Sequence, residues 1–306
     1  MKYKVTLAGF IITFLGAILF STKAIIVKLA FKYTDMDALS LLALRMLFSL
    51  PFYMGAAWMA SSAKDAVPLT RRQWVAIICL GLFGYYLSSL FDFVGLQYVT
   101  AGLERLILFL YPTFAVLMNA IVFKQGVNRL QKIALLLTYS GIAIAYLGEL
   151  RIDIDNPHFL WGSFLIFLCS ITFAMYITGS GRIIPKIGAT RFTAYAMLAS
   201  TAGIFVHFAL AGTMPPGGFS SVHWQYGLVL ALMATVLPSF MVSAGMKRIG
   251  SNNVAIISAI GPVSTIVQAY FILGEPFFKE QLIGTVLVVA GVLLIGWKQP
   301  KNVALK

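Results

Sequence analysis

The chain has 306 residues, of which 60% are hydrophobic and only 11% are charged, and its mean hydropathy is +0.89. About a quarter of the residues of a soluble globular protein are charged, so this composition excludes a soluble domain with or without an anchor. The net charge of +13 does not point to nucleic acid here, because basic residues gather in loops on one side of the predicted membrane spans.

Apolar runs of about 20 residues recur along the whole chain, without the period-2 alternation of barrel strands, and therefore predict membrane-spanning helices. The first run begins with basic residues like a secretory signal, but no small-x-small cleavage site follows, so we expect it to be retained. Ten spans are predicted, at residues 6–29, 38–59, 74–96, 101–123, 131–149, 158–179, 189–212, 224–246, 253–274 and 279–297.

The predicted topology follows from the distribution of Lys and Arg between the loops. If the N-terminus is inside, the inner loops and ends carry most of the basic residues, whereas the outer loops carry only Lys32, Arg151 and Lys279. The positive-inside rule then predicts a multi-pass protein of the cell (inner) membrane with both termini in the cytoplasm. The loops are short, so we expect no nucleotide-binding module that would power a pump.

The stretch from Gly95 to Gly148 has a counterpart 150 positions later, with an apolar run, a polar break and a second apolar run in the same order. The matched positions are Gly95 and Gly245, Pro112 and Pro262, Gln131 and Gln281, and Gly141 and Gly291. Five spans is an odd number, so the second copy enters the membrane in the opposite orientation. The fold class is thus predicted as an all-α integral membrane protein with two inverted five-helix repeats, residues 1–149 and 158–298, followed by a cytoplasmic tail at 299–306.

Five charged residues fall inside predicted spans, where an ionised side chain costs several kcal/mol and is a functional candidate. They are Lys23, Arg45, Asp92, Glu104 and Arg105. Glu104 also suits the positive end of a helix dipole, and Arg105 suits headgroup contact or pairing with Asp92, so structural roles remain open for these three. Their net charge of +1 favours a solute with a carboxylate or phosphate. Neutralising Lys23 is expected to abolish transport of an anion while leaving folding intact.

Other candidates for the translocation pathway are aromatic, imidazole and proline residues. Tyr86 and Tyr111 suit an amphipathic pocket, and the repeat places Tyr176 opposite Lys23. Glu104 and His207 are the two candidate proton relays, although a packing role is the stronger interpretation of His207. Pro112 and Pro262 interrupt spans four and nine and predict kinks with a gating role.

Several residues have ordinary packing roles in our interpretation. Cys79 and Cys169 lie inside apolar runs, so we expect neither a disulfide nor a metal site, and no cofactor is predicted. The glycines at positions 81, 84, 95, 141 and 291 are expected to allow close helix approach.

The residues also resemble a known family, the EamA carriers of the drug/metabolite transporter (DMT) superfamily. The motifs that carry the resemblance are LFSTKAIIVKLA, GLERLILFLYPTFAVL, ITFAMYITGSGR and IGPVSTIVQAYFILGEPFFKEQLIGTVLVVAGVLLI. The first copy departs from the pattern, since Lys124 and Gln125 replace the GE pair of the second copy. The resemblance covers nearly the whole chain and implies ten helices in two five-helix repeats and secondary transport, often export of metabolites, amino acids or drugs.

The expected function is a secondary transporter of a small organic metabolite that works by alternating access, with proton coupling through Glu104 or His207, as a monomer or homodimer. One alternative is a carrier of an organic anion or phosphorylated metabolite, gripped by Lys23 and Arg45. A lipid-modifying intramembrane enzyme is a remote alternative, since no nucleophile–base pair or metal-ligand spacing is present, and we expect the protein not to be an enzyme. A receptor or channel fits the inverted duplication less well than a carrier.

Overall fold

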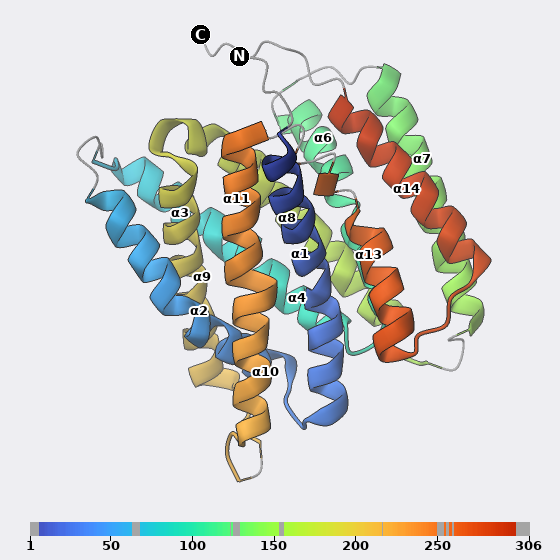
Figure 1. Ribbon diagram of the computed structural model, residues 1–306, viewed down its shortest axis with the longest axis horizontal. Coiled ribbons are helices and arrows are strands. Elements are labelled where there is room, and N and C mark those ends of the chain that lie inside the picture. Colours follow the sequence, from blue (N-terminus) through green and yellow to red (C-terminus); the bar gives the residue numbers. More distant parts are fainter. Residues whose placement is uncertain are drawn as a thin grey trace.

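The computed structural model of the protein describes residues 6–62, 68–122, 124, 129–152, 156–215, 217–249, 254, 257–258 and 260–297. All regular secondary structure in these residues is helical. The helices form one bundle in which the beginning of α1 (Leu7–Tyr33) and the end of α14 (Lys279–Trp297) lie at the same end (Figure 1). We refer to the opposite end, where α1 leads into α2 (Ala38–Ser61), as the α1–α2 end.

The helices follow the predicted spans closely, and two of the spans are broken. The remaining helices of the first half are α3 (Arg71–Gly81), η1 (Leu82–Leu87), α4 (Ser88–Gly95), α5 (Ala101–Leu108), α6 (Tyr111–Val122) and α7 (Arg129–Ile152), where η marks a π-helical segment. Those of the second half are α8 (Phe159–Ile187), α9 (Ala189–Ala211), α10 (Ser221–Ala231), η2 (Leu232–Val236), α11 (Leu237–Ile249), α13 (Gly261–Gln268) and η3 (Ala269–Leu273).

Eight of the described helices are long and apolar enough to cross a membrane by length and composition, and Gly261–Leu273 forms a shorter apolar helix. Residues 253, 255–256 and 259 at the start of the predicted ninth span lie outside the described residues. The chain is therefore a multi-pass membrane protein, and the count of ten spans stays a prediction.

Four helices begin after a residue whose side chain accepts a hydrogen bond from an amide of the first turn. These capping residues are Thr6 for α1, Asp37 for α2, Thr70 for α3 and Thr100 for α5. The first amides of a helix have no partner within the helix, so a Ser, Thr or Asp at this point fixes where each helix starts.

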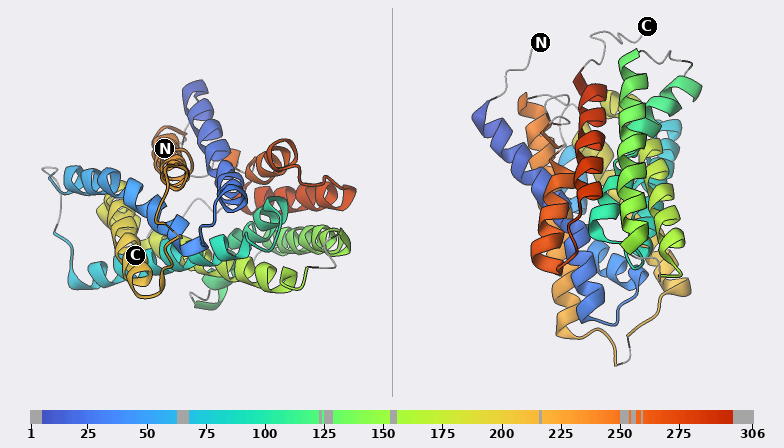
Figure 2. Two further views of the ribbon diagram at one scale, coloured as in Figure 1. Left: turned by 90° about the horizontal axis from the view of Figure 1, so that it is seen from below. Right: turned by 90° about the vertical axis from the view of Figure 1, so that its right-hand side faces the viewer.

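Helix α1 contacts helices from both halves of the chain. It packs against α5 of the first half and against η2, α11 and α13 of the second half. Helices α7 and α14 pack along each other at one edge of the bundle, whereas α2, α3 and α9 lie at the other edge (Figures 1 and 2). Helix α1 therefore lies between the two halves.

Close helix approach depends on glycine, as the sequence predicted for positions 81, 84, 95, 141 and 291. A Cβ atom at Gly141 would lie 2.6 Å from the carbonyl oxygen of Gly284, and one at Gly291 would lie 2.7 Å from that of Ala134. Both contacts join α7 to α14. The predicted packing role of these glycines is confirmed.

Several features of the two halves recur 150 residues apart, which is the offset of the duplicated sequence. Two of the three π-helical segments begin at Leu82 and Leu232, and the helices that follow the breaks in spans four and nine begin at Tyr111 and Gly261. The third segment, Ala269–Leu273, has no counterpart in α6. This recurrence supports the duplication. The inverted layout itself, like the boundaries 1–149 and 158–298, stays a prediction.

The recurrence extends to a left-handed residue after each broken span. Lys124 has a φ of 53° and Gly274 has a φ of 71°. Only glycine takes this conformation without steric cost, which is about 1–2 kcal/mol for other residues. We expect Lys124→Gly to raise the free energy of unfolding in micelles by about 0.5–1 kcal/mol, and Gly274→Ala to lower it by a similar amount. Lys124→Ala removes the same charge but keeps the strained backbone, so a gain of stability in that variant would contradict this explanation.

Candidate functional site

A buried cluster of charged residues joins three helices in the interior of the bundle. The Nζ atom of Lys23 on α1 lies 2.6 Å from Oδ2 of Asp92 on α4 and 3.5 Å from Oε1 of Glu104 on α5. The side chains of Asp92 and Glu104 are 1% and 0% exposed, and that of Lys23 is 17% exposed. We call Lys23, Asp92 and Glu104 the charge cluster. Three of the five sequence candidates thus meet at one point.

Local sequence explains why these three side chains are directed inward. Glu104 lies in the first turn of α5, which Thr100 caps. A carboxylate at this position interacts favourably with the positive end of the helix dipole. Asp92 follows η1 on a helix that packs against both α2 and α8. The ammonium group of Lys23 compensates both carboxylates, which lowers the cost of burying them.

Arg45 and Arg105, the two remaining candidates, lie close by without a carboxylate partner. Neither guanidinium group has a carboxylate oxygen within 4 Å among the described residues. Arg45 donates a hydrogen bond of 2.9 Å to Ser89 Oγ and lies 4.9 Å from the centre of the Phe93 ring. Its Nε atom is buried and has no hydrogen-bond partner in the described part of the chain.

Arg105, on α5, is held in a similar way by a hydroxyl group and an aromatic ring. It donates to Ser21 Oγ at 3.4 Å and lies 5.5 Å from the centre of the Phe109 ring, and its Nε atom also has no partner among the residues described. The sequence left pairing between Arg105 and Asp92 open. The structure instead pairs Asp92 with Lys23.

The start of α13 lies against Ser21 of α1 and Arg105 of α5, which are close in sequence to Lys23 and Glu104. Ser21 Oγ donates to the carbonyl oxygen of Gly261 at 3.1 Å, and Thr265 Oγ1 donates to the carbonyl oxygen of Ser21 at 3.3 Å. A Cβ atom at Gly261 would lie 2.9 Å from Nη2 of Arg105. The broken ninth span of the second half therefore reaches the charges of the first half.

Pro112 and Pro262 do not lie in the middle of unbroken helices. Each is the second residue of the helix that follows a break, α6 and α13 respectively. An amide at this point has no partner within a helix, so proline is tolerated there. Turn residues precede both helices, at Phe109 and Leu110 and at Ile260, and the kinks and their role in gating stay predictions.

The aromatic candidates lie outside the charge cluster. The hydroxyl of Tyr176 donates to that of Tyr85 at 3.1 Å, and the ring of Tyr111 packs edge-on against Phe173. Tyr176 lies on α8, and Tyr111 packs against α8 through Phe173.

His207 makes no contact with Glu104 among the described residues. Its Nδ1 atom lies 3.0 Å from the hydroxyl of Tyr86, and no carboxylate lies within 4 Å of it among the described residues. This arrangement suits the packing interpretation of His207 better than a relay that includes Glu104.

Glu275 is a functional candidate that the sequence reasoning did not single out. Its carboxylate accepts hydrogen bonds from the amides of Ala101 at 2.9 Å and Gly102 at 3.4 Å. It also lies 4.0 Å from Nζ of Lys28. The end of the ninth span therefore caps the start of the fourth span, close to Glu104. In the sequence, the only feature that pointed to Glu275 was the GE pair of the family motif.

We expect Glu275→Ala to lower the free energy of unfolding by about 1–3 kcal/mol, because it leaves the amides of Ala101 and Gly102 without partners. Both residues are buried. Glu275→Gln keeps an acceptor and is expected to lose about half as much. Equal stability of Glu275→Ala and the unchanged protein in micelles would contradict the capping role.

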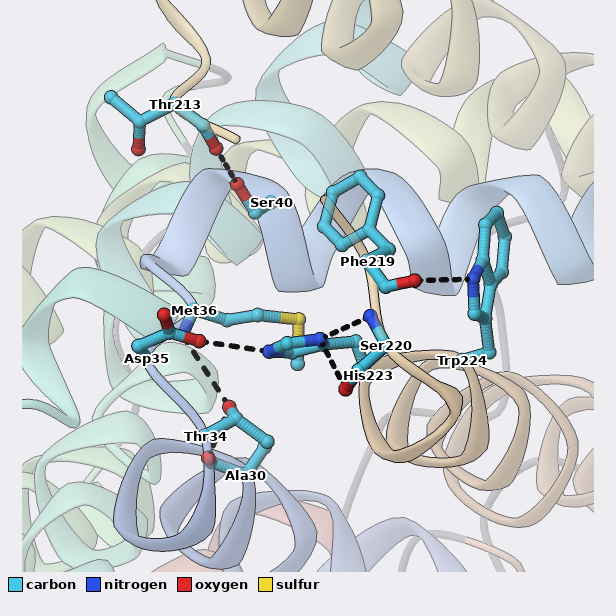
Figure 3. A network of polar contacts seen from close by, with 10 residues as sticks. All are labelled: Ala30, Thr34, Asp35, Met36, Ser40, Thr213, Phe219, Ser220, His223 and Trp224. Atoms are coloured by element: carbon cyan, nitrogen blue, oxygen red, sulfur yellow. Dashed lines mark hydrogen bonds and ion pairs between the residues drawn. The ribbon is translucent and has the colours of Figure 1, made fainter. Parts of the chain in front are cut away.

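A second set of polar contacts ties the two halves together at the α1–α2 end (Figure 3). His223 accepts a hydrogen bond from the Ser220 amide on Nδ1 at 2.8 Å, so its Nε2–H donates to Asp35 Oδ1 at 2.9 Å. The Ser40 hydroxyl donates to the carbonyl oxygen of Thr213 at 2.7 Å. The connection between α1 and α2 is thereby held against that between α9 and α10.

Comparison with known proteins gives a consistent result. The model of the EamA-like transporter family matches residues 7–147 and 160–297. The chain is 30% identical over 293 residues to "Uncharacterized transporter YcbK" of Bacillus subtilis (strain 168), covering 92% of this chain and 91% of that protein. It is 25% identical over 241 residues to "Uncharacterized transporter YetK" of the same organism, covering 78% and 73%.

A solved crystal structure shares the fold. It has a TM-score of 0.63 and 17% identity, and the match covers 94% of this chain and 96% of that one. The family match includes every residue of the charge cluster. The sequence, the helical bundle and these relatives together establish that the chain belongs to the EamA-like transporter family.

Proposed function

We propose that the protein is a secondary carrier that moves a small organic solute across the cell membrane by alternating access. The observation that carries this proposal is the charge cluster, in which Lys23 contacts Asp92 and Glu104 inside the bundle. Charged groups at such positions are costly and mark solute or ion pathways in membrane proteins. Packing alone does not explain these charges, because apolar residues of similar size often pack at equal or lower cost.

The two-state motion would come from two inverted five-helix repeats that rock against each other. The π-helical segments and helix breaks that recur at an offset of 150 residues support this layout. Broken helices near a central site are typical of inverted-repeat carriers. In this proposal the α1–α2 end faces outward and both termini are cytoplasmic, as the basic loops indicate.

Proton coupling is assigned to the charge cluster in this proposal, with export as the direction of transport. Two carboxylates share one ammonium group there, so loss or gain of one proton changes which groups are charged. Glu104 is the preferred relay, since His207 contacts only Tyr86 among the polar candidates.

An anionic solute is the second candidate, favoured by the two arginines. Lys23 is already compensated by carboxylates, whereas Arg45 and Arg105 have no carboxylate within 4 Å among the described residues. In this version Arg45 binds the solute anion and Lys23 positions the carboxylates. Arg45→Gln should abolish transport of anions, and Arg45→Lys should keep part of it.

The experiment is reconstitution into liposomes followed by a counterflow screen of labelled amino acids, organic acids and nucleosides, with and without a pH gradient. Exchange of one solute class that is lost in Lys23→Met, with the variant shown to be folded in the liposomes, supports the carrier. Absence of exchange for every solute, with folded protein in the liposomes, would overturn it.

A further inference from the structure

Helix α2 carries a row of polar side chains on its buried face. Arg45, Ser49 and Tyr53 follow one another at intervals of four residues, which places them on one face of the helix. Their exposed fractions are 4%, 0% and 3%. We call these three residues the α2 stripe. The sequence reasoning singled out only Arg45, because the two hydroxyl groups carry no charge.

Two atoms of the α2 stripe are buried without a hydrogen-bond partner in the described part of the chain. They are Nε of Arg45 and Oγ of Ser49. Arg45 donates a hydrogen bond to Ser89, which uses one of the five N–H donors of its guanidinium group. Buried polar atoms nearly always have a partner, so two that lack one at successive turns of a helix require an explanation. A ligand that bonds to both groups would supply it.

The charge balance of the interior favours an anion as that ligand. Arg45 has no carboxylate within 4 Å among the described residues. Asp92 is near enough to Arg45 for a Coulomb interaction, but its ion-pair partner is Lys23 at 2.6 Å. Lys23, Arg45, Asp92, Glu104 and Arg105 together carry a net charge of +1. One bound carboxylate would therefore neutralise the buried charges, which lowers the cost of keeping them out of water.

The surroundings of the α2 stripe are apolar and aromatic. The centre of the Phe93 ring lies 4.9 Å from the guanidinium carbon of Arg45. Phe93 and Tyr53 belong to a hydrophobic core cluster to which η2 contributes Ala234 and Val236. A solute bound here therefore needs an apolar body beside its polar groups, because a purely polar molecule would leave this surface uncovered.

The spacing of the two groups without partners limits the shape of the solute. Arg45 and Ser49 are four residues apart, which is about 6 Å along a helix. A carboxylate at the guanidinium group therefore leaves Ser49 to a second polar group of the same molecule. A hydroxyl group suits this position, since it can donate to the serine hydroxyl or accept from it.

The α2 stripe lies where the two halves of the chain meet. Ser49 is close to the midpoint of α2 (Ala38–Ser61), and α2 packs against α9, α10 and η2 of the second half. The hydroxyl of Tyr53 lies within hydrogen-bond distance, 3.2 Å, of Ser239 Oγ on α11. Tyr53 is farther from the α1–α2 end than Ser49, so this contact closes the stripe toward the end that carries the termini. Separation of the halves would open it.

We propose that the α2 stripe is the solute-binding site, where Arg45 binds the carboxylate of a small hydroxylated organic acid and Ser49 bonds to its hydroxyl group. The inference rests on the anionic version of the proposed function and names the class of the anion. Ser49 is the residue that sets the specificity for the hydroxyl group.

The test measures binding of labelled 4-hydroxybenzoate to the protein in phosphatidylcholine nanodiscs by equilibrium dialysis, with empty nanodiscs as the background. In this acid a rigid ring separates the carboxylate from the hydroxyl group. Benzoate, which lacks only the hydroxyl group, is expected to compete about ten-fold more weakly, which corresponds to the loss of one hydrogen bond. 4-Hydroxybenzyl alcohol, which lacks the carboxylate, is expected not to compete. Absence of 4-hydroxybenzoate binding, or equal competition by benzoate or by the alcohol, would overturn the proposal.

Serine variants connect the specificity to the α2 stripe. The hydroxyl of Ser49 has no partner among the residues described, so Ser49→Ala should keep the stability of the protein. This variant should bind 4-hydroxybenzoate about ten-fold more weakly and benzoate equally well. Ser163→Ala is the matched control, because Ser163 Oγ on α8 is also buried without a partner in the described residues and lies outside the stripe. Preference for the hydroxylated acid that survives in Ser49→Ala, or that is lost in Ser163→Ala, would overturn the proposal.

The arginine variant tests the carboxylate contact. Arg45→Gln should abolish binding of both acids. If this variant does not fold, the comparison of 4-hydroxybenzoate with 4-hydroxybenzyl alcohol in the unchanged protein decides whether the carboxylate is recognised. Binding of both acids at the original strength in folded Arg45→Gln would contradict the assignment.

The outcome is separable from that of the carrier proposal. Binding that depends on Ser49, without counterflow of any solute, would keep the site and remove the carrier. Counterflow of a solute without binding of 4-hydroxybenzoate would keep the carrier and remove the α2 stripe as the site for a hydroxylated acid.

Discussion

Replacing Lys23 with methionine is expected to abolish transport and to lower the free energy of unfolding by about 3–5 kcal/mol, because two buried carboxylates lose their cation. Asp92 and Glu104 are at most 1% exposed, so water cannot replace the ammonium group. The measurements are counterflow in liposomes and equilibrium unfolding in mixed micelles. The sequence alone predicted intact folding for this change, and the ion pairs of Lys23 are the reason for the revised expectation.

Two further variants separate the transport role of Lys23 from its structural role. Lys23→Arg keeps the charge and should keep most of the stability. Lys23→Met combined with Asp92→Leu replaces the closest ion pair by apolar groups, and should recover much of the stability because such replacements are often neutral or stabilising. We expect no transport from this stable double variant. Transport at the original rate would show that the charge cluster is only structural.

The second large effect is expected at the contact between α7 and α14. A Cβ atom at Gly284 would lie 2.5 Å from the carbonyl oxygen of Gly141, and a backbone atom cannot move aside as a flexible side chain can. We expect Gly284→Ala to cost about 1–3 kcal/mol through forced separation of the two helices. Equilibrium unfolding in micelles measures this loss of stability. If forced helix separation is the cause, Gly291→Ala should lower the free energy of unfolding by a similar amount.

Gly55→Ala is the matched control for this prediction. Gly55 lies on α2, and a Cβ atom there would have no other atom within 4 Å. The same substitution should therefore be neutral or stabilising by up to about 1 kcal/mol, since alanine favours a helix more than glycine does. A loss of stability at Gly55 equal to that at Gly284 would point to a general effect of alanine and not to packing.

The membrane-spanning architecture was predictable because long apolar runs dominate the chain. The predicted helix ends were less accurate where a helix continues beyond its apolar run. The predicted sixth span ends at residue 179, whereas α8 continues to Ile187 through Arg182 and Lys186. Backbone hydrogen bonds hold this polar end in the helix, and hydropathy does not detect them. The π-helical segments left no pattern in the sequence either.

The members of the charge cluster were predictable, and their partners were not. A charge in an apolar run is conspicuous, so Lys23, Asp92 and Glu104 stood out individually. Which of them meet depends on how three helices are rotated and tilted against each other, and the spacing of residues along the chain does not contain this information. The capping role of Glu275 was not predictable, because Glu275 follows a span and lies outside the apolar run. The amides that it caps, of Ala101 and Gly102, are 174 and 173 residues away in the sequence.

The π-helical segment Leu82–Leu87 has a consequence for how this protein tolerates changes in chain length. A π-helical turn holds an additional residue relative to an α-helical turn. Deleting one residue there would restore a regular helix and leave the residues after it on the same faces, because the π-helical turn absorbs the additional residue. Asp92 follows five residues later and would still face Lys23. The same deletion in an α-helical part, such as Ser88–Gly95, would turn everything after it by about 100°. The segment Leu232–Val236 precedes α11, which packs against α1, in the same way. A single-residue deletion in either π-helical segment should therefore reduce transport less than a deletion in the α-helical residues that follow it.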